Sequence, residues 1–153
     1  MSATHASYEA PGWGVGEVWL EGDCLLHHEL PRPAVEPRGR NHALAERFAR
    51  YFSGGPDDFL DVSIELDGAT EFELELTEAL RRIRRGETVT YGELAALAAR
   101  PNAQRAAGSF CARNRFAIVV PCHRVVAADG LGSYGSLGVD YKRRLLELEG
   151  VAV

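Results

Sequence analysis

Residues 90–112 read TYGELAALAARPNAQRAAGSFCA, and this stretch predicts two short helices joined by a tight turn. Thr90, with Glu93 three residues later, is typical of a capping box and places the start of the first helix. Pro101 predicts the break that follows, and the second helix is expected over residues 103–112. Such a pair is typical of a helix-turn-helix, although most short helix pairs bind nothing.

A further helix is expected just upstream, over residues 70–85. Leu76, Leu80 and Ile83 recur at helical spacing, and Gly86 is a stop signal. The first half of the chain predicts a small sheet with one helix. Its strands are expected over residues 14–20, 25–30 and 62–66, its helix from Asn41 through Tyr51, and an unstructured leader over residues 1–12.

The composition is that of a globular protein with one domain or two small subdomains. The chain has 153 residues, of which 46% are hydrophobic and 25% charged, and this excludes global disorder. It has no apolar run near the roughly 20 residues that span a bilayer and no secretory signal, so we expect a cytoplasmic protein without membrane contact. Three cysteines, without a regular framework, predict reduced thiols.

Charge is distributed unevenly along the chain. The formal net charge is −5, yet residues 1–79 carry 5 arginines against 16 acidic residues, whereas residues 80–153 carry 12 basic against 6 acidic residues. A basic half beside an acidic half suggests a surface that faces phosphate. The alternative is that a run of arginines only solvates one helix end, namely Arg81, Arg82, Arg84 and Arg85.

A cysteine followed directly by a histidine comes after a buried stretch. Residues 117–120 are apolar and predict a buried strand or extended segment, which leads to Pro121, Cys122 and His123. Neighbouring side chains on a strand point to opposite sides, so a turn after Pro121 is needed to bring both into one pocket. There the imidazole can remove the thiol proton and create a nucleophile. The alternative is a buried cysteine beside a solvated histidine.

Four motifs together point to one family. The segment NRFAIVVPCHRVV, residues 114–126, resembles the active-site motif of the O6-alkylguanine-DNA alkyltransferases, the methylated-DNA–protein-cysteine methyltransferases. The other landmarks of that family occur in the same order, as VTYGELA over 89–95, QRAAG over 104–108 and LLELEG over 145–150. Four motifs in order are far more specific than one. The resemblance covers residues 70–150 and hardly extends to the first 69.

The resemblance implies a fold in two parts. Residues 1–69 would form an α/β subdomain similar to ribonuclease H, and residues 70–153 an α-helical DNA-binding and alkyl-acceptor domain with a winged-helix-like helix-turn-helix. It implies direct repair of double-stranded DNA by a monomer that needs no cofactor. One departure concerns the helix near residue 70, where TEFE replaces the usual Thr-Pro-Phe-Gln and Thr77 stands at the usual tryptophan position.

The same resemblance assigns roles to five residues. Cys122 would accept the alkyl group from guanine O6 in one displacement and keep it, so each molecule acts once. His123 would deprotonate the thiol through a water, and Glu149 would orient the histidine, which is the logic of a triad. Tyr91 would donate a hydrogen bond to the departing guanine, and Asn114 would support the active-site turn.

DNA contacts are implied for a second group of residues. Arg105 would fill the space of the guanine that is flipped out of the duplex, because the target carbon is unreachable inside it. Small residues beside it would let the helix approach the minor groove. The implied contacts to DNA backbone and base come from Ala106, Gly108, Arg113, Arg115, Val125, Tyr134 and Ser136.

Two rival functions and a metal site are also weighed. A lesion-binding sensor without transfer activity would lack the acceptor, and Cys122 is present; a cysteine hydrolase would need an oxyanion hole that no motif supports. Potential zinc ligands follow no compact zinc spacing, so no metal is expected at His5, Cys24, His27 and His28. Cys111 lacks an adjacent base and is expected to be a small packed residue.

Overall fold

The computed structural model describes residues 3–153, and the chain divides into two units. Unit 1 consists of residues up to Glu65 together with Arg115–Val119, and unit 2 consists of Leu66–Asn114 together with Val120–Val153. The short segment Arg115–Val119 thus belongs to unit 1, together with the first part of the chain. The division expected after residue 69 placed this segment in the second part. None of the helices in residues 3–153 is long and apolar enough to cross a membrane.

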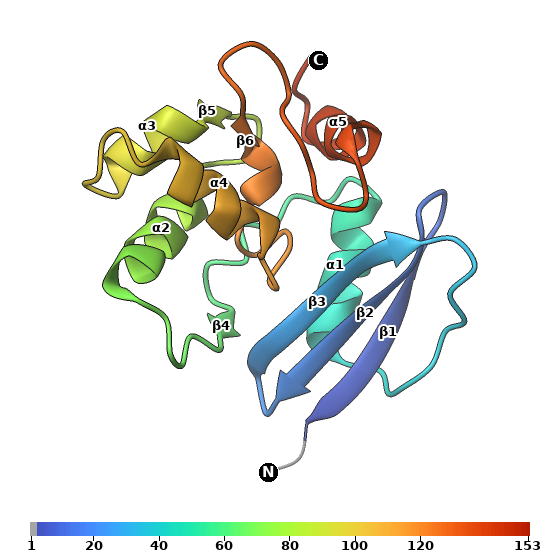
Figure 1. The fold of residues 1–153 in the computed structure, drawn as a ribbon. Coiled ribbons are helices and arrows are strands. Elements are labelled where there is room, and N and C mark those ends of the chain that lie inside the picture. Colours follow the sequence, from blue (N-terminus) through green and yellow to red (C-terminus); the bar gives the residue numbers. More distant parts are fainter. Residues whose placement is uncertain (1–2) are drawn as a thin grey trace. The chain divides into compact units, whose positions relative to one another are not determined.

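Unit 1 is built on a four-stranded mixed sheet (Figure 1). Two antiparallel hairpins join the first three strands, and the short fourth strand runs parallel to the third. In sheet order the strands are β1 (Thr4–Ala10), β2 (Gly14–Glu21), β3 (Cys24–Arg32) and β4 (Ser63–Ile64). The strands expected over 14–20 and 25–30 are therefore present, and the one expected over 62–66 is reduced to the two residues of β4.

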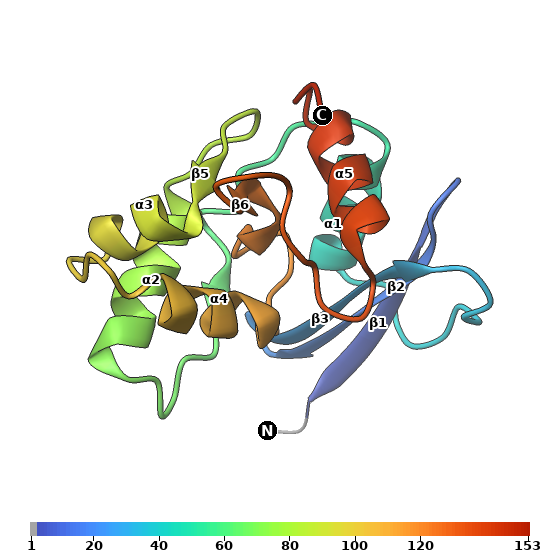
Figure 2. The ribbon, with the colours of Figure 1, turned by 45° about the horizontal axis from the view of Figure 1, so that its top comes forward.

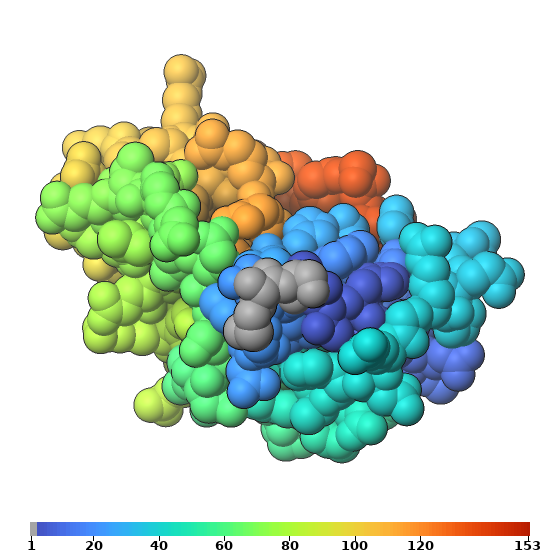
Figure 3. All heavy atoms as spheres, turned by 90° about the horizontal axis from the view of Figure 1, so that it is seen from below, coloured from blue at the N-terminus to red at the C-terminus, as the bar shows by residue number. Residues whose placement is uncertain are grey.

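The prediction of an unstructured leader over residues 1–12 is wrong from Thr4 onward. Residues 1 and 2 lie outside the described range. Residues 4–10 form the edge strand β1, whose dark blue atoms lie open on the face shown in Figure 3. Ala6, Tyr8 and Ala10 alternate toward the core, and each is at most 6% exposed. The residues between them are mostly polar, and their local pattern predicts a loop. The strand forms because it pairs with β2, a contact that a local pattern does not reveal.

One amphipathic helix, α1 (Ala43–Phe52), covers a face of this sheet (Figures 1 and 2). Its N-cap is His42, one residue after the expected Asn41, and the His42 ring accepts a hydrogen bond from the backbone N–H of Leu44. The buried side of α1 carries Phe48, whose ring stacks on the His28 imidazole of β3 at 3.9 Å. This aromatic contact joins helix and sheet.

His28 is buried yet fully hydrogen-bonded. Its Nδ1–H donates to the carbonyl of Ala117 at 2.7 Å, and its Nε2 accepts from the Tyr8 hydroxyl at 2.6 Å. Burial lowers the pKa of His28 to about 3, so the ring stays neutral at physiological pH. This ring connects β3 to the segment Arg115–Val119 within unit 1.

The apolar run at 117–120 does not form the expected strand. The backbone N–H of His28 donates to the Arg115 carbonyl at 2.8 Å, and Phe116 pairs with β3 through a single bridge, after which the chain turns. Ile118 has a φ of 75°, an unusual value for a β-branched residue. Ile118 and Val119 are at most 3% exposed. The burial of these apolar side chains stabilises the turn, which lacks the regular hydrogen bonds of a strand.

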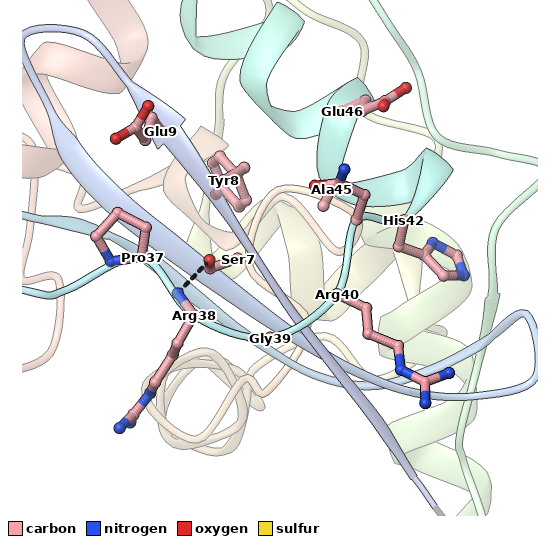
Figure 4. A pocket seen from close by; sticks show the side chains of 11 residues that line it. Ser7, Tyr8, Glu9, Pro37, Arg38, Gly39, Arg40, His42, Ala45 and Glu46 are labelled. Carbon is pink, nitrogen blue, oxygen red and sulfur yellow. Dashed lines mark hydrogen bonds between the residues drawn. The ribbon is translucent and has the colours of Figure 1, made fainter.

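Unit 1 also contains an open hollow of about 510 Å³ between β1, residues 37–42 and the start of α1 (Figure 4). The backbone N–H of Arg38 donates to the Ser7 hydroxyl at 2.8 Å across its floor. The side chains of Arg38 and Arg40 point away from each other, so no concentrated positive charge faces the hollow.

Unit 2 is mainly helical. Its elements are α2 (Glu71–Arg81), β5 (Val89–Thr90), α3 (Tyr91–Leu97), α4 (Gln104–Ala112), the 3₁₀ turn η1 (Cys122–Arg124), β6 (Val125–Val126) and α5 (Val139–Leu148). The two strands pair in parallel, Val89 with Val125 and Thr90 with Val126. Helix α3 contacts both α2 and α4, and α5 contacts η1.

Capping boxes begin two of these helices. Thr70 and Glu73 exchange hydrogen bonds at the start of α2, and Thr90 with Glu93 do the same at α3, which confirms the expected start of the first short helix. The helix expected over 70–85 is shorter than predicted. It ends at Arg81, and the chain continues in turns to Gly86, which has a φ of 89°.

Candidate active site

The Cys122 thiol lies at the start of a tight turn. Pro121 caps η1, and the backbone N–H of Arg124 donates to the Pro121 carbonyl at 3.0 Å. The Asn114 amide donates to the carbonyl of Val120 at 2.8 Å and so holds the residues that lead into the turn. Cys122 is 4% exposed and His123 fully buried. The turn expected after Pro121 is therefore present.

His123 is held by a buried carboxylate. Its Nε2–H donates to Oε2 of Glu149 at 2.9 Å, and both side chains are fully inaccessible. Glu149 follows directly after α5, and α5 contacts η1. The end of this helix therefore places the carboxylate beside His123. Because Nε2 carries the proton, Nδ1 is left as the basic nitrogen, and it has no hydrogen-bond partner among the described residues.

The same carboxylate also binds an arginine. Arg124 donates from Nε to Oε1 of Glu149 at 2.9 Å and from Nη2 to Oε2 at 2.8 Å, a bidentate pair, and its Nη1 donates to the Ile83 carbonyl at 2.6 Å. The sequence reasoning assigned no role to Arg124. Its position directly after Cys-His was the available signal, but the partner 25 residues away was not visible in the sequence.

Burial sets the proton positions in this cluster. It raises the pKa of the Cys122 thiol well above its ordinary value, and the hydrogen bond and charge of Cys111 raise it further; Lys142 and Asn114 only partly oppose them. Burial also lowers the pKa of His123, which the Glu149 carboxylate partly offsets. The resting pair is therefore a neutral thiol and a neutral imidazole.

Glu149 is charged in spite of its burial. Burial raises its pKa, but the hydrogen bonds and charges of His123 and Arg124 outweigh this and hold the pKa well below the usual range. The site thus keeps one fixed negative charge behind the histidine, and that charge stabilises any imidazolium that forms.

Lys142 is a second residue that the sequence reasoning missed. Its side chain is fully buried, its Nζ donates to the Ser133 carbonyl at 3.2 Å, and it lies 5.6 Å from the centre of the Tyr91 ring. The charged sequence of this helix predicts that the lysine side chain is exposed. Only the fold shows that it is buried. Gly132 permits this packing, since with a φ of 78° an added Cβ would lie 3.3 Å from the Tyr91 ring.

A small cavity of about 30 Å³ opens beside the thiol. Of the predicted residues, Cys122, Tyr91, Gly108 and Tyr134 line it, whereas Ser136 is exposed and does not; the remaining lining residues are Cys111, Ala112, Ser133 and Gly135. Burial raises the pKa of Tyr91, and it raises that of Tyr134 well above its usual value, so both hydroxyls remain protonated donors. Val125 is buried in β6, which follows directly after η1.

The predicted contact residues on α4 face solvent. Arg105 and Ala106 are exposed, Gly108 is half-buried, and Ala107 packs inward. No side chain caps the α4 N-terminus through a hydrogen bond, and this end of the helix carries no acidic residue in its first turn. The exposed side of α4 is therefore lined with small residues next to one long cation.

The two remaining arginines differ in their surroundings. Arg113 is exposed just after α4, with its Nη2 4.0 Å from Oε2 of Glu73. Arg115 belongs to unit 1, where its guanidinium lies 3.3 Å from the Glu65 carboxylate and donates to backbone carbonyls of Leu26 and Glu65. The structure therefore groups Arg113 with α4 and gives Arg115 partners elsewhere.

The histidines weighed as zinc ligands have other partners. His5 donates to Glu17 at 2.8 Å and His27 to Glu29 at 2.6 Å, while His28 takes part in the core described above. Within residues 3–153, no cluster of three or more His, Cys, Asp or Glu side chains is arranged to hold a metal ion.

Comparison with known proteins adds an independent finding. A family model described as 6-O-methylguanine DNA methyltransferase, DNA binding domain, matches residues 71–151. A methylated-DNA–protein-cysteine methyltransferase of Methanopyrus kandleri is 47% identical over 129 residues, which cover 82% of this chain and 95% of the relative.

Solved structures agree over almost the whole chain. The crystal structure of Mycobacterium tuberculosis O6-methylguanine methyltransferase is similar at a TM-score of 0.80 and 31% identity, covering 99% of this chain and 96% of that one. The M. tuberculosis OGT in complex with DNA is similar at a TM-score of 0.79 and 34% identity, covering 95% and 92%. The mixed sheet and five α-helices within residues 3–153 thus match a known fold. With this agreement in sequence, fold and active-site motif, the chain belongs to the O6-methylguanine-DNA methyltransferase family.

Proposed function

We propose that the protein repairs DNA by moving an alkyl group from O6 of guanine to Cys122, irreversibly and once per molecule. The observation that carries this proposal is the buried arrangement of Cys122, His123 and Glu149, in which the carboxylate fixes the imidazole and leaves Nδ1 as the base. A sensor that only binds lesions has no need of such a thiol and base.

The transfer is a single displacement. The thiol proton passes through a water to Nδ1 of His123, and the Glu149 carboxylate stabilises the imidazolium that results. The sulfur then attacks the alkyl carbon, the C–O6 bond breaks, and the electron pair stays with guanine. Tyr91, whose hydroxyl is protonated, donates to the departing base and offsets its negative charge. No step releases the alkyl group from sulfur, so the protein is consumed.

The roles of the thiol and base follow from their resting states. A thiol whose pKa is raised by burial is protonated at rest, and it becomes nucleophilic when the base removes its proton at the moment of attack. Lys142 and Asn114 favour the thiolate once it forms. Asn114 thereby supports both the turn and the reacting sulfur.

The proposed DNA contacts lie in the helical unit 2, except for Arg115, which belongs to unit 1. Helices α3 and α4 would act as the helix-turn-helix of a winged-helix-like domain, with α4 in the minor groove, where Ala106 and Gly108 allow close approach. Arg105 would occupy the space of the flipped alkylguanine. The base would then be held near Val125, Tyr134 and Ser136, and phosphates would be bound by Arg113 and Arg115.

The proposal extends to the organisation of the chain. Residues 1–69 would be a ribonuclease-H-like subdomain and residues 70–153 the DNA-binding and acceptor domain, acting together as a monomer. The active cysteine must stay reduced to react, and within residues 3–153 none of the protein's three cysteines forms a disulfide, which favours a reducing cytoplasmic compartment.

Mass spectrometry of the intact protein tests the proposal. After incubation with a duplex that contains one O6-methylguanine, we expect the protein to gain the mass of one methylene group. The gain should be confined to the tryptic peptide with Cys122 and saturate at one per molecule. An unchanged mass together with tight binding to the lesion would favour a non-transferring sensor, and repeated turnover would contradict single use.

Arg105→Ala should separate base flipping from chemistry. Loss of this side chain is expected to slow methyl transfer from duplex DNA by about tenfold or more, because extrusion of the base costs a few kcal/mol that the arginine offsets. Reaction with the free O6-methylguanine base should change little. Rates with both substrates, followed by intact mass, measure the difference.

Arg84→Ala is the matched control. It removes the same charge from an exposed position outside α4 and should leave the ratio of the two rates unchanged. Equal slowing of both substrates by Arg105→Ala would show that Arg105 does not replace the flipped base.

A further inference from the structure

A second thiol lies in the acceptor cavity. Cys111, in the last turn of α4, lines the same small cavity as Cys122. Both residues border this cavity of about 30 Å³, so the two thiols adjoin one small space. Cys111 is partly exposed, whereas Cys122 is 4% exposed, so the pair combines one accessible and one sheltered thiol. The sequence reasoning expected Cys111 to be only a packed residue.

Asn114 connects the two segments that carry these thiols. Its backbone N–H donates to the Cys111 carbonyl at 3.2 Å, and its side-chain amide donates to the Val120 carbonyl at 2.8 Å, two residues before Cys122. The cavity thus brings together two cysteines that are 11 positions apart in the sequence. The third cysteine, Cys24, lies in β3 of unit 1.

We propose that Cys111 and Cys122 are a redox-active dithiol, which a hydroperoxide oxidises to an intramolecular disulfide that blocks alkyl transfer until it is reduced. The pairing of the two thiols is argued from the cavity that they share, and only the effect of the disulfide on transfer rests on the proposed function. Bridged cysteines must lie close together before oxidation, and the small cavity that both residues line brings Cys111 and Cys122 near each other.

The oxidation is balanced in two steps. His123 takes the Cys122 proton, and the thiolate attacks one peroxide oxygen, forming a sulfenic acid while the other oxygen takes the proton and leaves as water or an alcohol. The Cys111 sulfur then attacks the sulfenic sulfur, the S–S bond forms, and hydroxide leaves with the Cys111 proton as water. The two thiols give up two electrons, and the peroxide receives them.

A resolving thiol has a clear chemical consequence here. A sulfenic acid without a neighbouring thiol is oxidised further to sulfinic acid, which ordinary thiol reductants do not reverse. Because the acceptor has only one reacting sulfur, that oxidation would destroy the molecule. A disulfide with Cys111 keeps Cys122 recoverable by a dithiol such as dithiothreitol.

Peptide mapping after oxidation tests the proposal. The reduced full-length protein is treated with one equivalent of hydrogen peroxide, free thiols are alkylated with iodoacetamide under denaturing conditions, and tryptic peptides are weighed. We expect peptides 106–113 and 116–124 to be joined, with the loss of two hydrogen atoms. Methyl transfer should be lost with the same dose dependence and return after dithiothreitol.

Three variants, each normalised to its own untreated activity, make the test specific. Cys24→Ser should respond like the wild type. With two or more equivalents of hydrogen peroxide, Cys111→Ser and Cys111→Ala should lose transfer without recovery in dithiothreitol, whereas the wild type should recover. Their Cys122 peptide should carry sulfinic acid, because oxidation of one thiol to this level consumes two peroxide molecules. Two different substitutions are used because one of them could cause a folding defect. The peptide map of the wild type tests the disulfide without any variant.

Two results would overturn the proposal. One is a wild-type map in which Cys111 stays free while Cys122 is oxidised or unchanged. The other is full recovery of the Cys111 variants by dithiothreitol. A joined peptide in a protein that never accepts methyl when reduced would instead leave the dithiol standing and refute the proposed function.

Discussion

Cys122→Ala should abolish methyl transfer and leave DNA binding intact. The side chain that remains has no nucleophile, so no mass gain is expected at any incubation time with the methylated duplex. The thiol is neutral at rest and lies in a small cavity, so its removal should cost about 1 kcal/mol of stability. Intact mass and fluorescence anisotropy with labelled duplex measure the two properties separately.

Cys24→Ala provides the comparison for this variant. It removes the thiol of unit 1 and should retain full methyl transfer. If Cys122→Ala lost binding and transfer together, the thiol would be part of the binding surface and not solely the acceptor. A methylated Cys122→Ala protein would place the acceptor elsewhere.

Glu149→Gln should lower both the stability of the protein and the rate of transfer. The substitution leaves the buried Arg124 guanidinium without its charge partner, and breaking a buried pair in this way costs about 3–5 kcal/mol. The imidazole also loses the charge that stabilises its protonated form, so transfer should slow on the order of 10²-fold. Urea unfolding and single-turnover rates provide the two numbers.

The effect of Glu149→Gln depends on pH with a defined sign. The folded-state pKa of Glu149 lies well below its ordinary value of 4.5, so its stabilising contribution is fully present above that pH and is lost as the pH falls through the folded pKa. The difference in unfolding free energy between wild type and variant should therefore narrow below pH 4.5.

Glu147→Gln is the matched control on the same helix. Glu147 is exposed, so its neutralisation should change stability by less than about 0.5 kcal/mol and leave the rate unchanged. Should Glu149→Gln behave like Glu147→Gln, the carboxylate would have no part in activating the histidine.

Local features of this protein were readable from the sequence. The capping boxes at Thr70 and Thr90 involve residues three apart, and β2 and β3 are short contiguous stretches rich in apolar residues, so short windows contain the signal. The motif around Cys122 was likewise contiguous, and the turn that it requires is present.

Features that depend on distant partners were not readable. Strand β1 exists through its pairing with β2, and Lys142 is buried because of its contacts with Tyr91 and the Ser133 carbonyl. Arg124 and Glu149 meet across 25 positions, and the cavity that Cys111 and Cys122 share depends on how α4 lies beside the η1 turn.

The sequence by itself therefore determined the local elements, the family and the reacting thiol. The tertiary structure alone decided how Glu149 is shared between His123 and Arg124, and that a second thiol lines the cavity of the acceptor. The physical reason is that backbone propensity and capping act within a few residues, whereas burial, pKa and side-chain partnership are set by groups that only folding brings together.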